Sequence, residues 1–222
     1  MKEQIKTEEN VGKGSWVYRG ARDTVYVFSK IFFRLEIHGE ENIPAEGSCV
    51  LASNHVSFLD PPLIACVARF KRRAVRFMAR DTLYSSAFES WFLNAIHAIP
   101  LSRDKGDIAA LRTAIKTIKS GSPVALFPEG TRTDDGDLKD AKGGVAFLVA
   151  KSGVPVIPIY IDGIYAAYPK TAKFIKPHKV RIFVGQPIHP SELKPKKKGT
   201  EGYKQVGDFV MSKIAQLRPS KQ

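Results

Sequence analysis

Residues 49–70 read CVLASNHVSFLDPPLIACVARF and combine a strand, a turn and a helix in close succession. Residues 49–52 form a short apolar run typical of a buried strand, and the turn-forming residues Ser53 and Asn54 follow. Proline is favoured at the first position of a helix, and the residue before a proline avoids the helical conformation. We therefore expect Asp60 to be the N-cap of a helix over residues 61–70. A strand that leads directly into a helix is typical of α/β domains.

The same succession continues along the chain. Runs rich in Val and Ile predict further strands at residues 75–79, 98–101, 123–127, 156–161 and 180–184. Longer periodic stretches predict helices at residues 85–96, 108–119, 143–152 and 203–217. This alternation favours an α/β fold with a largely parallel central sheet covered by helices on both faces. Because no repeat or linker interrupts the pattern, residues 38–222 are expected to form one domain.

A separate helical pattern precedes this domain. Apolar side chains share one stripe of residues 16–36, namely Val17, Ala21, Val25, Phe28, Phe32 and Leu35. Charged side chains share another, namely Arg19, Asp23, Lys30 and Arg34. Such a helix either packs on a domain core or lies in a membrane interface, and the pattern leaves both readings open. We expect residues 15–37 to be an amphipathic membrane-surface helix and the polar residues 1–14 to be a flexible tail.

Composition narrows the class of protein and its partners. The 222 residues are 43% hydrophobic and 26% charged, which excludes wholesale disorder. The 35 Lys and Arg against 22 Asp and Glu give a net charge of +13, which favours nucleic acid, an anionic membrane or acidic substrates as partners.

Cys49 and Cys66 lie in apolar runs, so buried thiols in a reducing compartment are expected rather than a disulfide framework. The longest runs without a charge have thirteen residues, too few for a membrane span, and residues 1–14 lack a secretory signal.

His55 and Asp60 are the first candidates for chemistry. The predicted turn lets the His55 ring fold back onto the Asp60 carboxylate. An imidazole can then take a proton from a hydroxyl, while the carboxylate fixes its tautomer and stabilises the imidazolium. No G-x-S-x-G nucleophile motif occurs, so a substrate hydroxyl is favoured as the attacking group over Ser57. The alternative is a histidine that only makes a structural hydrogen bond.

A second group follows the predicted strand at residues 123–127. Glu129, Gly130, Thr131 and Arg132 provide a close backbone approach, a hydroxyl and a guanidinium suited to a phosphate, although alone they also fit an ordinary surface turn. Arg80 and Arg103 end two other predicted strands. Because the carboxyl ends of parallel strands meet at one edge, the three arginines are expected to converge beside the His55 pair.

Together these motifs resemble the glycerolipid acyltransferase family. Its H-x4-D block matches His55 and Asp60 within residues 54–61, and its arginine-ending block matches residues 98–103. Its E-G-T-R block matches residues 129–132, and its proline-centred block matches residues 154–159 with Pro158 as the key proline. The four blocks occur in the family's order over about half of the chain, from residue 54 to residue 163.

The resemblance implies a reaction in which the hydroxyl of lysophosphatidic acid attacks an acyl thioester, giving phosphatidic acid and free CoA or acyl-carrier protein. It implies that His55 is the general base and Asp60 its orienting partner. It assigns the acceptor phosphate to Arg103, Arg132 and a basic residue near Arg80, with Glu129 organising these cations. Gly130 and Thr131 would shape the pocket, and Asn54 and Pro158 complete the predicted substrate-binding set. No metal or redox cofactor is implied.

Two positions depart from the family. Arg80 stands where lysine is usual, and His97 stands where glycine is common. Other acceptors therefore remain alternatives, namely glycerol-3-phosphate, a lysophospholipid or a lyso-aminolipid. A different class of alternative is a non-catalytic module that binds anionic lipid or nucleic acid. Because no zinc-ligand spacing, RNP-type motif or basic heptad region occurs, we expect no nucleic-acid partner. The expected location is the cytoplasmic face of a membrane, peripheral or monotopic, where the basic residues attract anionic lipid.

Overall fold

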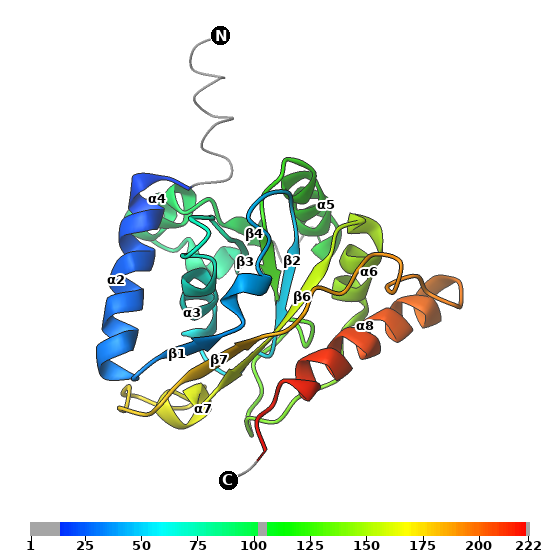
Figure 1. Ribbon diagram of the computed structural model, residues 1–222. Helices are drawn as coiled ribbons and strands as arrows, with labels where there is room; N and C mark the ends of the chain where they lie inside the picture. Colours follow the sequence, from blue (N-terminus) through cyan, green and yellow to red (C-terminus); the bar gives the residue numbers. More distant parts are fainter. Residues whose placement is uncertain (1–13, 102–105, 221–222) are drawn as a thin grey trace.

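A seven-stranded sheet organises the computed structural model, which describes residues 14–101 and 106–220 (Figure 1). Its strands are β1 (Glu36–His38), β2 (Val50–Ser53), β3 (Arg76–Arg80), β4 (Ile99–Leu101), β5 (Val124–Leu126), β6 (Val156–Asp162) and β7 (Arg181–Val184). The strand order is β1-β7-β6-β2-β5-β3-β4. The β6–β7 pair is antiparallel and the other five neighbouring pairs are parallel, which confirms the predicted α/β fold with a largely parallel sheet.

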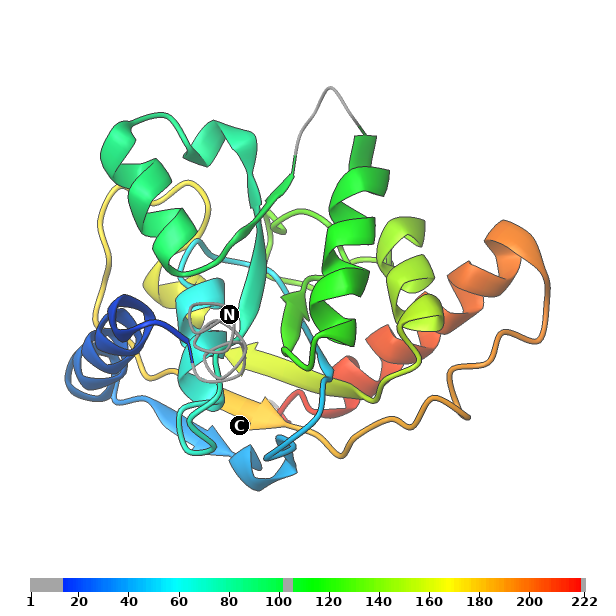
Figure 2. The same ribbon diagram turned by 90° about the horizontal axis from the view of Figure 1, so that it is seen from above.

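Helices cover both faces of the sheet (Figures 1 and 2). On one side lie α2 (Trp16–Phe32) and α3 (Asp60–Val67), and on the other lie α5 (Gly106–Lys119), α6 (Gly143–Ser152) and α8 (Gly199–Gln216). The shorter helices α4 (Ala87–Ala95) and α7 (Ile164–Ala167) and the 3-10 turns η1 (Glu40–Asn42) and η2 (Asp81–Leu83) lie in the connections. The predicted helices therefore occur, with ends shifted by a few residues.

Alternate residues of the central strands pack into two apolar clusters. Leu51 of β2 belongs to the cluster that contains Leu63 and Ile64 of α3, whereas Val50 belongs to the cluster that contains Ile118 of α5. Because successive side chains of a strand point to opposite faces, this is the pattern of a sheet buried on both sides. Cys49 and Cys66 are buried free thiols, as predicted.

The first strand was not predicted, because the sequence pattern continued the N-terminal helix to residue 36. In the structure α2 ends at Phe32, and Arg34 adopts the left-handed conformation with φ 49°. The Phe33 carbonyl then accepts from the Val180 N–H at 3.0 Å, and the Glu36 N–H donates to the Val180 carbonyl at 3.0 Å. Pairing with a strand so distant in the chain overrides the local helical pattern.

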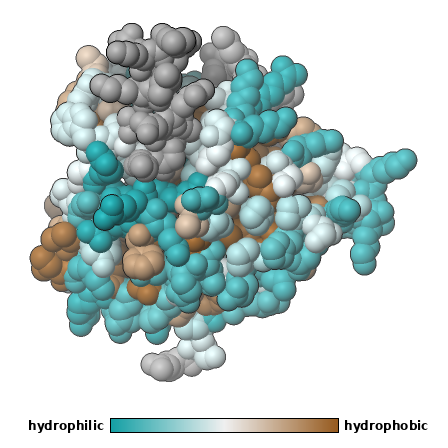
Figure 3. Space-filling view, turned by 45° about the horizontal axis from the view of Figure 1, so that its top comes forward, coloured by the Kyte–Doolittle hydropathy of each residue, from teal (hydrophilic) through white to brown (hydrophobic). Residues whose placement is uncertain are grey.

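Helix α2 packs with a partly polar face and exposes apolar side chains. Its buried residues include Tyr18, whose hydroxyl accepts from the Val75 N–H at 2.9 Å. Trp16 and Ile31 are 76% and 77% exposed, and Val27 and Phe28 are also exposed. Figure 3 shows hydrophobic side chains at the left edge, where α2 lies in Figure 1, beside a largely hydrophilic surface. None of the helices in the described ranges combines the length and apolarity that crossing a bilayer requires.

Candidate active site

The predicted site residues follow neighbouring parallel strands. The His55 loop follows β2, the Glu129 loop follows β5, and Arg80 ends β3. Because β2 and β3 both pair in parallel with β5, these three carboxyl ends lie at the same edge of the sheet. The edge on which ligands bind in open α/β sheets therefore carries the candidate chemistry.

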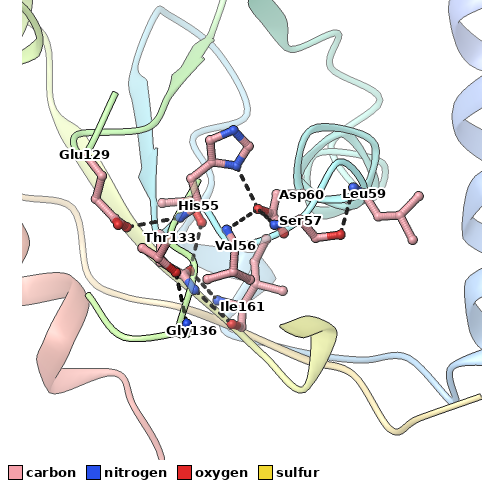
Figure 4. A network of polar contacts seen from close by, with 11 residues as sticks. His55, Val56, Ser57, Leu59, Asp60, Glu129, Thr133, Gly136 and Ile161 are labelled. Atoms are coloured by element: carbon pink, nitrogen blue, oxygen red, sulfur yellow. Dashed lines mark hydrogen bonds and ion pairs between the residues drawn. The ribbon is translucent and has the colours of Figure 1, made fainter. Parts of the chain in front are cut away.

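His55 and Asp60 form the central pair (Figure 4). His55 Nδ1 lies 2.8 Å from Asp60 Oδ2, and the other ring nitrogen points away from the carboxylate. The His55 side chain keeps 18% of its surface exposed, whereas the Asp60 side chain is fully buried. With Nδ1–H donating to the carboxylate, Nε2 carries the lone pair and faces outward.

Asp60 closes the turn rather than capping the helix. The structure makes it the first residue of α3 instead of the predicted N-cap, and Oδ2 accepts from the N–H groups of Val56 at 2.7 Å and Ser57 at 2.8 Å. The next two residues, Pro61 and Pro62, have no N–H that a capping side chain could bind. Burial raises the pKa of the Asp60 carboxyl, and the hydrogen bonds from His55 and the two amides oppose that rise.

Glu129 connects two loops. It is 1% exposed, and its carboxylate accepts from the His55 N–H at 3.1 Å and from the Lys139 N–H at 3.3 Å. Burial raises the pKa of Glu129 to about 7, against the lowering effect of these two hydrogen bonds. The sequence predicted that Glu129 organises the arginines. Among the described residues it binds backbone amides instead, and this fixes the position of His55.

Two further contacts to His55 were not anticipated. The Thr133 N–H donates to the His55 carbonyl at 2.9 Å, and the imidazole stacks on the Phe127 ring with 3.9 Å between ring centroids. Thr133 is fully buried. Both residues border the Glu129–Arg132 motif, so adjacency to the motif was the available signal. The Thr133 hydrogen bond restrains the backbone of His55, and the Phe127 ring restricts the orientation of the imidazole.

Of the three arginines predicted to bind phosphate, the structure describes Arg80 and Arg132. The Arg132 guanidinium lies 3.3 Å from the centroid of the Phe58 ring, and its Nη1 is buried without a hydrogen-bond partner in the ranges that the structure describes. Burial lowers the pKa of Arg132, and the positive charge of nearby Arg80 lowers it further. Arg80 ends β3 at the same edge of the sheet, so both charges lie on the side that carries His55. Arg103 lies outside the described residues.

The Gly130 and Thr131 backbone completes this loop. Gly130 adopts φ 67°, and its N–H donates to the Phe127 carbonyl at 2.9 Å, so the turn uses the left-handed conformation that glycine tolerates. Gly130 is exposed and Thr131 is partly exposed. Their role in shaping a pocket stays a prediction.

Three other residues differ from their predicted or alternative roles. The Asn54 side-chain amide binds the backbone of β6: it accepts from the Ile161 N–H at 2.8 Å and donates to the Ile161 carbonyl at 3.0 Å. Pro158 is a buried residue of β6 whose register partner is Ala52 of β2. Neither side chain is placed to hold substrate, and both shape the strands beneath the site. Ser57 is fully buried, which excludes its hydroxyl as a nucleophile.

Several known proteins are similar to this chain in sequence. An acyltransferase family model matches residues 34–162. The chloroplastic 1-acyl-sn-glycerol-3-phosphate acyltransferase of Brassica napus is 32% identical over 165 residues, which cover 72% of this chain and 47% of that protein. The Bacillus subtilis 1-acyl-sn-glycerol-3-phosphate acyltransferase is 27% identical over 179 residues, covering 80% of this chain and 85% of that protein.

A solved structure shares the fold. The crystal structure of the 1-acyl-sn-glycerophosphate (LPA) acyltransferase of Thermotoga maritima superposes with a TM-score of 0.76 at 28% identity, covering all of this chain and 86% of that one. The chain spans about half the length of the chloroplastic relatives. Since the family model covers more than half of the sequence, this chain belongs to the acyltransferase family.

Proposed function

We propose that this protein transfers a fatty acyl group from acyl-CoA or acyl-carrier protein to the free hydroxyl of 1-acylglycerol-3-phosphate, forming phosphatidic acid. The observation that carries the proposal is the outward-facing nitrogen of an imidazole held 2.8 Å from a buried carboxylate, next to Arg132. Relatives named 1-acyl-sn-glycerol-3-phosphate acyltransferase support the choice of acceptor.

His55 acts as the general base in this reaction. As the acceptor hydroxyl oxygen bonds to the thioester carbonyl carbon, its proton moves to His55 Nε2, and the Asp60 carboxylate stabilises the imidazolium. When the tetrahedral intermediate collapses, the C–S bond breaks and the leaving thiolate takes the proton from His55. Atoms and charges therefore balance without a covalent enzyme intermediate.

Arg132 and Arg80 bind the phosphate of the acceptor, together with Arg103 as the third predicted cation. The two-pronged hydrogen bonding of guanidinium suits phosphate oxygens, and a bound phosphate fixes the acceptor hydroxyl relative to His55. A phosphate oxygen also supplies the partner that Arg132 Nη1 lacks within residues 14–101 and 106–220. Because base, orienting acid and anion-binding groups all come from the chain, the reaction as written requires no metal or redox cofactor.

The acceptor is a lipid, so we place the protein on the cytoplasmic face of a membrane. The exposed apolar residues of α2, Trp16, Val27, Phe28 and Ile31, support interfacial binding. Replacing Val27 and Ile31 with Ser removes apolar surface at positions where it is exposed, so the fold should persist. We expect weaker sedimentation with vesicles, and unchanged sedimentation would assign membrane binding to other surfaces.

Thiol release on mixing the protein with acyl-CoA tests the proposed reaction. 1-Acylglycerol-3-phosphate should support release better than glycerol-3-phosphate, a lysophospholipid or a lyso-aminolipid. His55→Ala should abolish it, whereas His189→Ala, at an exposed position, provides a matched control. Equal turnover in a folded His55→Ala protein would disprove the mechanism, and preference for another acceptor would change the assigned substrate.

A further inference from the structure

A basic hollow lies at the other end of α3 from the candidate active site. It has a volume of about 380 Å³ and is lined by Arg19, Arg22, Asp23 and Arg72. The first three belong to α2, and Arg72 belongs to the turn after α3. Asp60 begins α3 and this turn follows its end, so the helix separates the two sites. Figure 2 shows α2 and α3 side by side.

Cations outnumber the carboxylate at this hollow. Asp23 Oδ1 accepts from Arg22 Nε at 3.0 Å and from Arg69 Nε at 3.0 Å, and Arg22 Nη2 lies 3.0 Å from the same oxygen. Arg19 and Arg72 bring two more guanidinium groups to the rim. A single carboxylate thus faces four arginines, which leaves a local positive excess that attracts an anion.

The hollow also contains an incompletely bonded cation. Arg22 is 7% exposed, and its Nη1 is buried without a hydrogen-bond partner in the part of the chain that the structure describes. A buried, unpaired N–H of a charged group is unfavourable. A phosphate oxygen that reached Nη1 from the hollow would provide the missing acceptor, and its charge would neutralise part of the positive excess.

Exposed aromatic side chains flank the arginines. Trp16 lies one helical turn before Arg19 and is 76% exposed. Phe70 lies between Arg69 and Arg72 in the turn and is 65% exposed, with Lys71 Nζ 5.3 Å from its ring centroid. Aromatic rings interleaved with cations are typical of surfaces that contact lipid headgroups.

We propose that Arg19, Arg22 and Arg72 form a phosphate-binding site, separate from the candidate active site, that holds the phosphate group of an anionic lipid headgroup. This inference does not depend on the acyl-transfer reaction. Occupancy of the site would fix how α2 lies on the bilayer, because the hollow and the exposed apolar side chains belong to the same helix. The site would bind a phosphate group through its guanidinium groups, and the flanking aromatic rings favour a lipid as the molecule that bears this phosphate.

Vesicle sedimentation of the full chain tests the site. The variant is Arg19→Gln with Arg72→Gln, since both side chains are exposed. The control is Lys194→Gln with Lys196→Gln, which removes the same charge from an exposed segment. Each protein is mixed with phosphatidylcholine vesicles containing phosphatidylglycerol, and with vesicles of equal surface charge in which oleate replaces phosphatidylglycerol. Thermal unfolding verifies that both variants fold.

We expect the arginine variant to bind phosphatidylglycerol vesicles roughly tenfold more weakly than the unmodified protein, with a much smaller loss on oleate vesicles and for the lysine control. Calorimetric titration with inorganic phosphate tests whether the site also binds free phosphate or only the phosphate of a lipid. Heat of binding that the arginine variant loses would extend the site to free phosphate, and absence of such heat would restrict it to lipid. Equal losses for the two variants, or equal losses on the two vesicle types, would overturn the proposal.

Discussion

Replacing Asp60 with Asn separates the charge of this residue from its shape. Oδ2 accepts three hydrogen bonds, from His55, Val56 and Ser57, whereas Oδ1 has no partner within the described residues. Three donors require an acceptor, so the amide oxygen of Asn should take the Oδ2 position. The two backbone amides then hold that oxygen in place, and His55 keeps its tautomer and orientation.

The expected loss is the electrostatic stabilisation of the imidazolium. The charge on the ring lies about 4 Å from the carboxylate, and at an effective dielectric constant of about 20 their attraction is about 4 kcal/mol. Losing it should lower kcat about a thousandfold. Because burial raises the pKa of Asp60, removing its charge also removes a desolvation cost, so the free energy of unfolding should change by only about 1 kcal/mol.

Thiol release at several concentrations of 1-acylglycerol-3-phosphate separates kcat from KM. We expect KM to change little, because the Asp60 carboxylate is fully buried and bonds to His55 and two backbone amides. Asp60→Ala is the comparison, since it leaves the Val56 and Ser57 amides without their acceptor and should also destabilise the protein by about 1–3 kcal/mol per group. A folded Asp60→Asn protein that keeps more than a tenth of the turnover would refute the assigned role of the carboxylate.

Three more predictions concern single residues. Arg132→Gln should raise KM for the acceptor at least tenfold with a smaller effect on kcat, because a charge-assisted bond to phosphate is lost; initial rates test this, and an unchanged KM would contradict it. Glu129→Gln should remove a pH dependence of the free energy of unfolding. The pKa of Glu129 is raised to about 7 from an ordinary 4.5, so the folded protein binds a proton more tightly than the unfolded chain. Relative to the variant, the wild-type free energy of unfolding should therefore fall by up to about 3 kcal/mol between about pH 4.5 and pH 7. Urea unfolding at pH 4.5 and pH 8 measures that difference, and equal differences at both pH values would refute it. His97→Gly should raise the free energy of unfolding by about 1 kcal/mol, because His97 is exposed and adopts φ 55°; a loss of stability in thermal unfolding would oppose this.

His97 also illustrates how far the sequence could predict local shape. The sequence marked this position only as a departure from the glycine that is common in the family. In the structure His97 adopts the left-handed conformation, with the His97 N–H bonded to the Asn94 carbonyl at 2.9 Å. Surrounding structure has imposed the conformation on a residue that does not favour it, which single-residue preference cannot predict.

The strands and helices of the domain core were predictable because their apolar patterns are local. The end of α2 was not, since Glu36 pairs with Arg181 in β7. Which side of α2 faces the core also escaped prediction. The periodicity located a stripe, but Tyr18 and Arg22 fill the buried side, while Phe28 of the predicted stripe is 45% exposed. Tertiary hydrogen bonds such as that between Tyr18 and Val75 decided the orientation.

The site motifs identified the correct neighbourhood but not how its parts are connected. His55 and Glu129 are 74 positions apart, yet the backbone of His55 is bonded on both sides to the loop that carries the second motif. Its N–H donates to Glu129, and its carbonyl accepts from the Thr133 N–H. A carboxylate can accept from the His55 and Lys139 amides simultaneously, whereas a glutamine amide would place a donor against one of them. The side chain of His55 is fixed separately by Asp60. The backbone and the ring of His55 are therefore restrained by independent contacts. The outer ring nitrogen is left as the part of His55 that can contact a substrate. This fixed placement of the base is the physical reason that the two distant motifs must occur together.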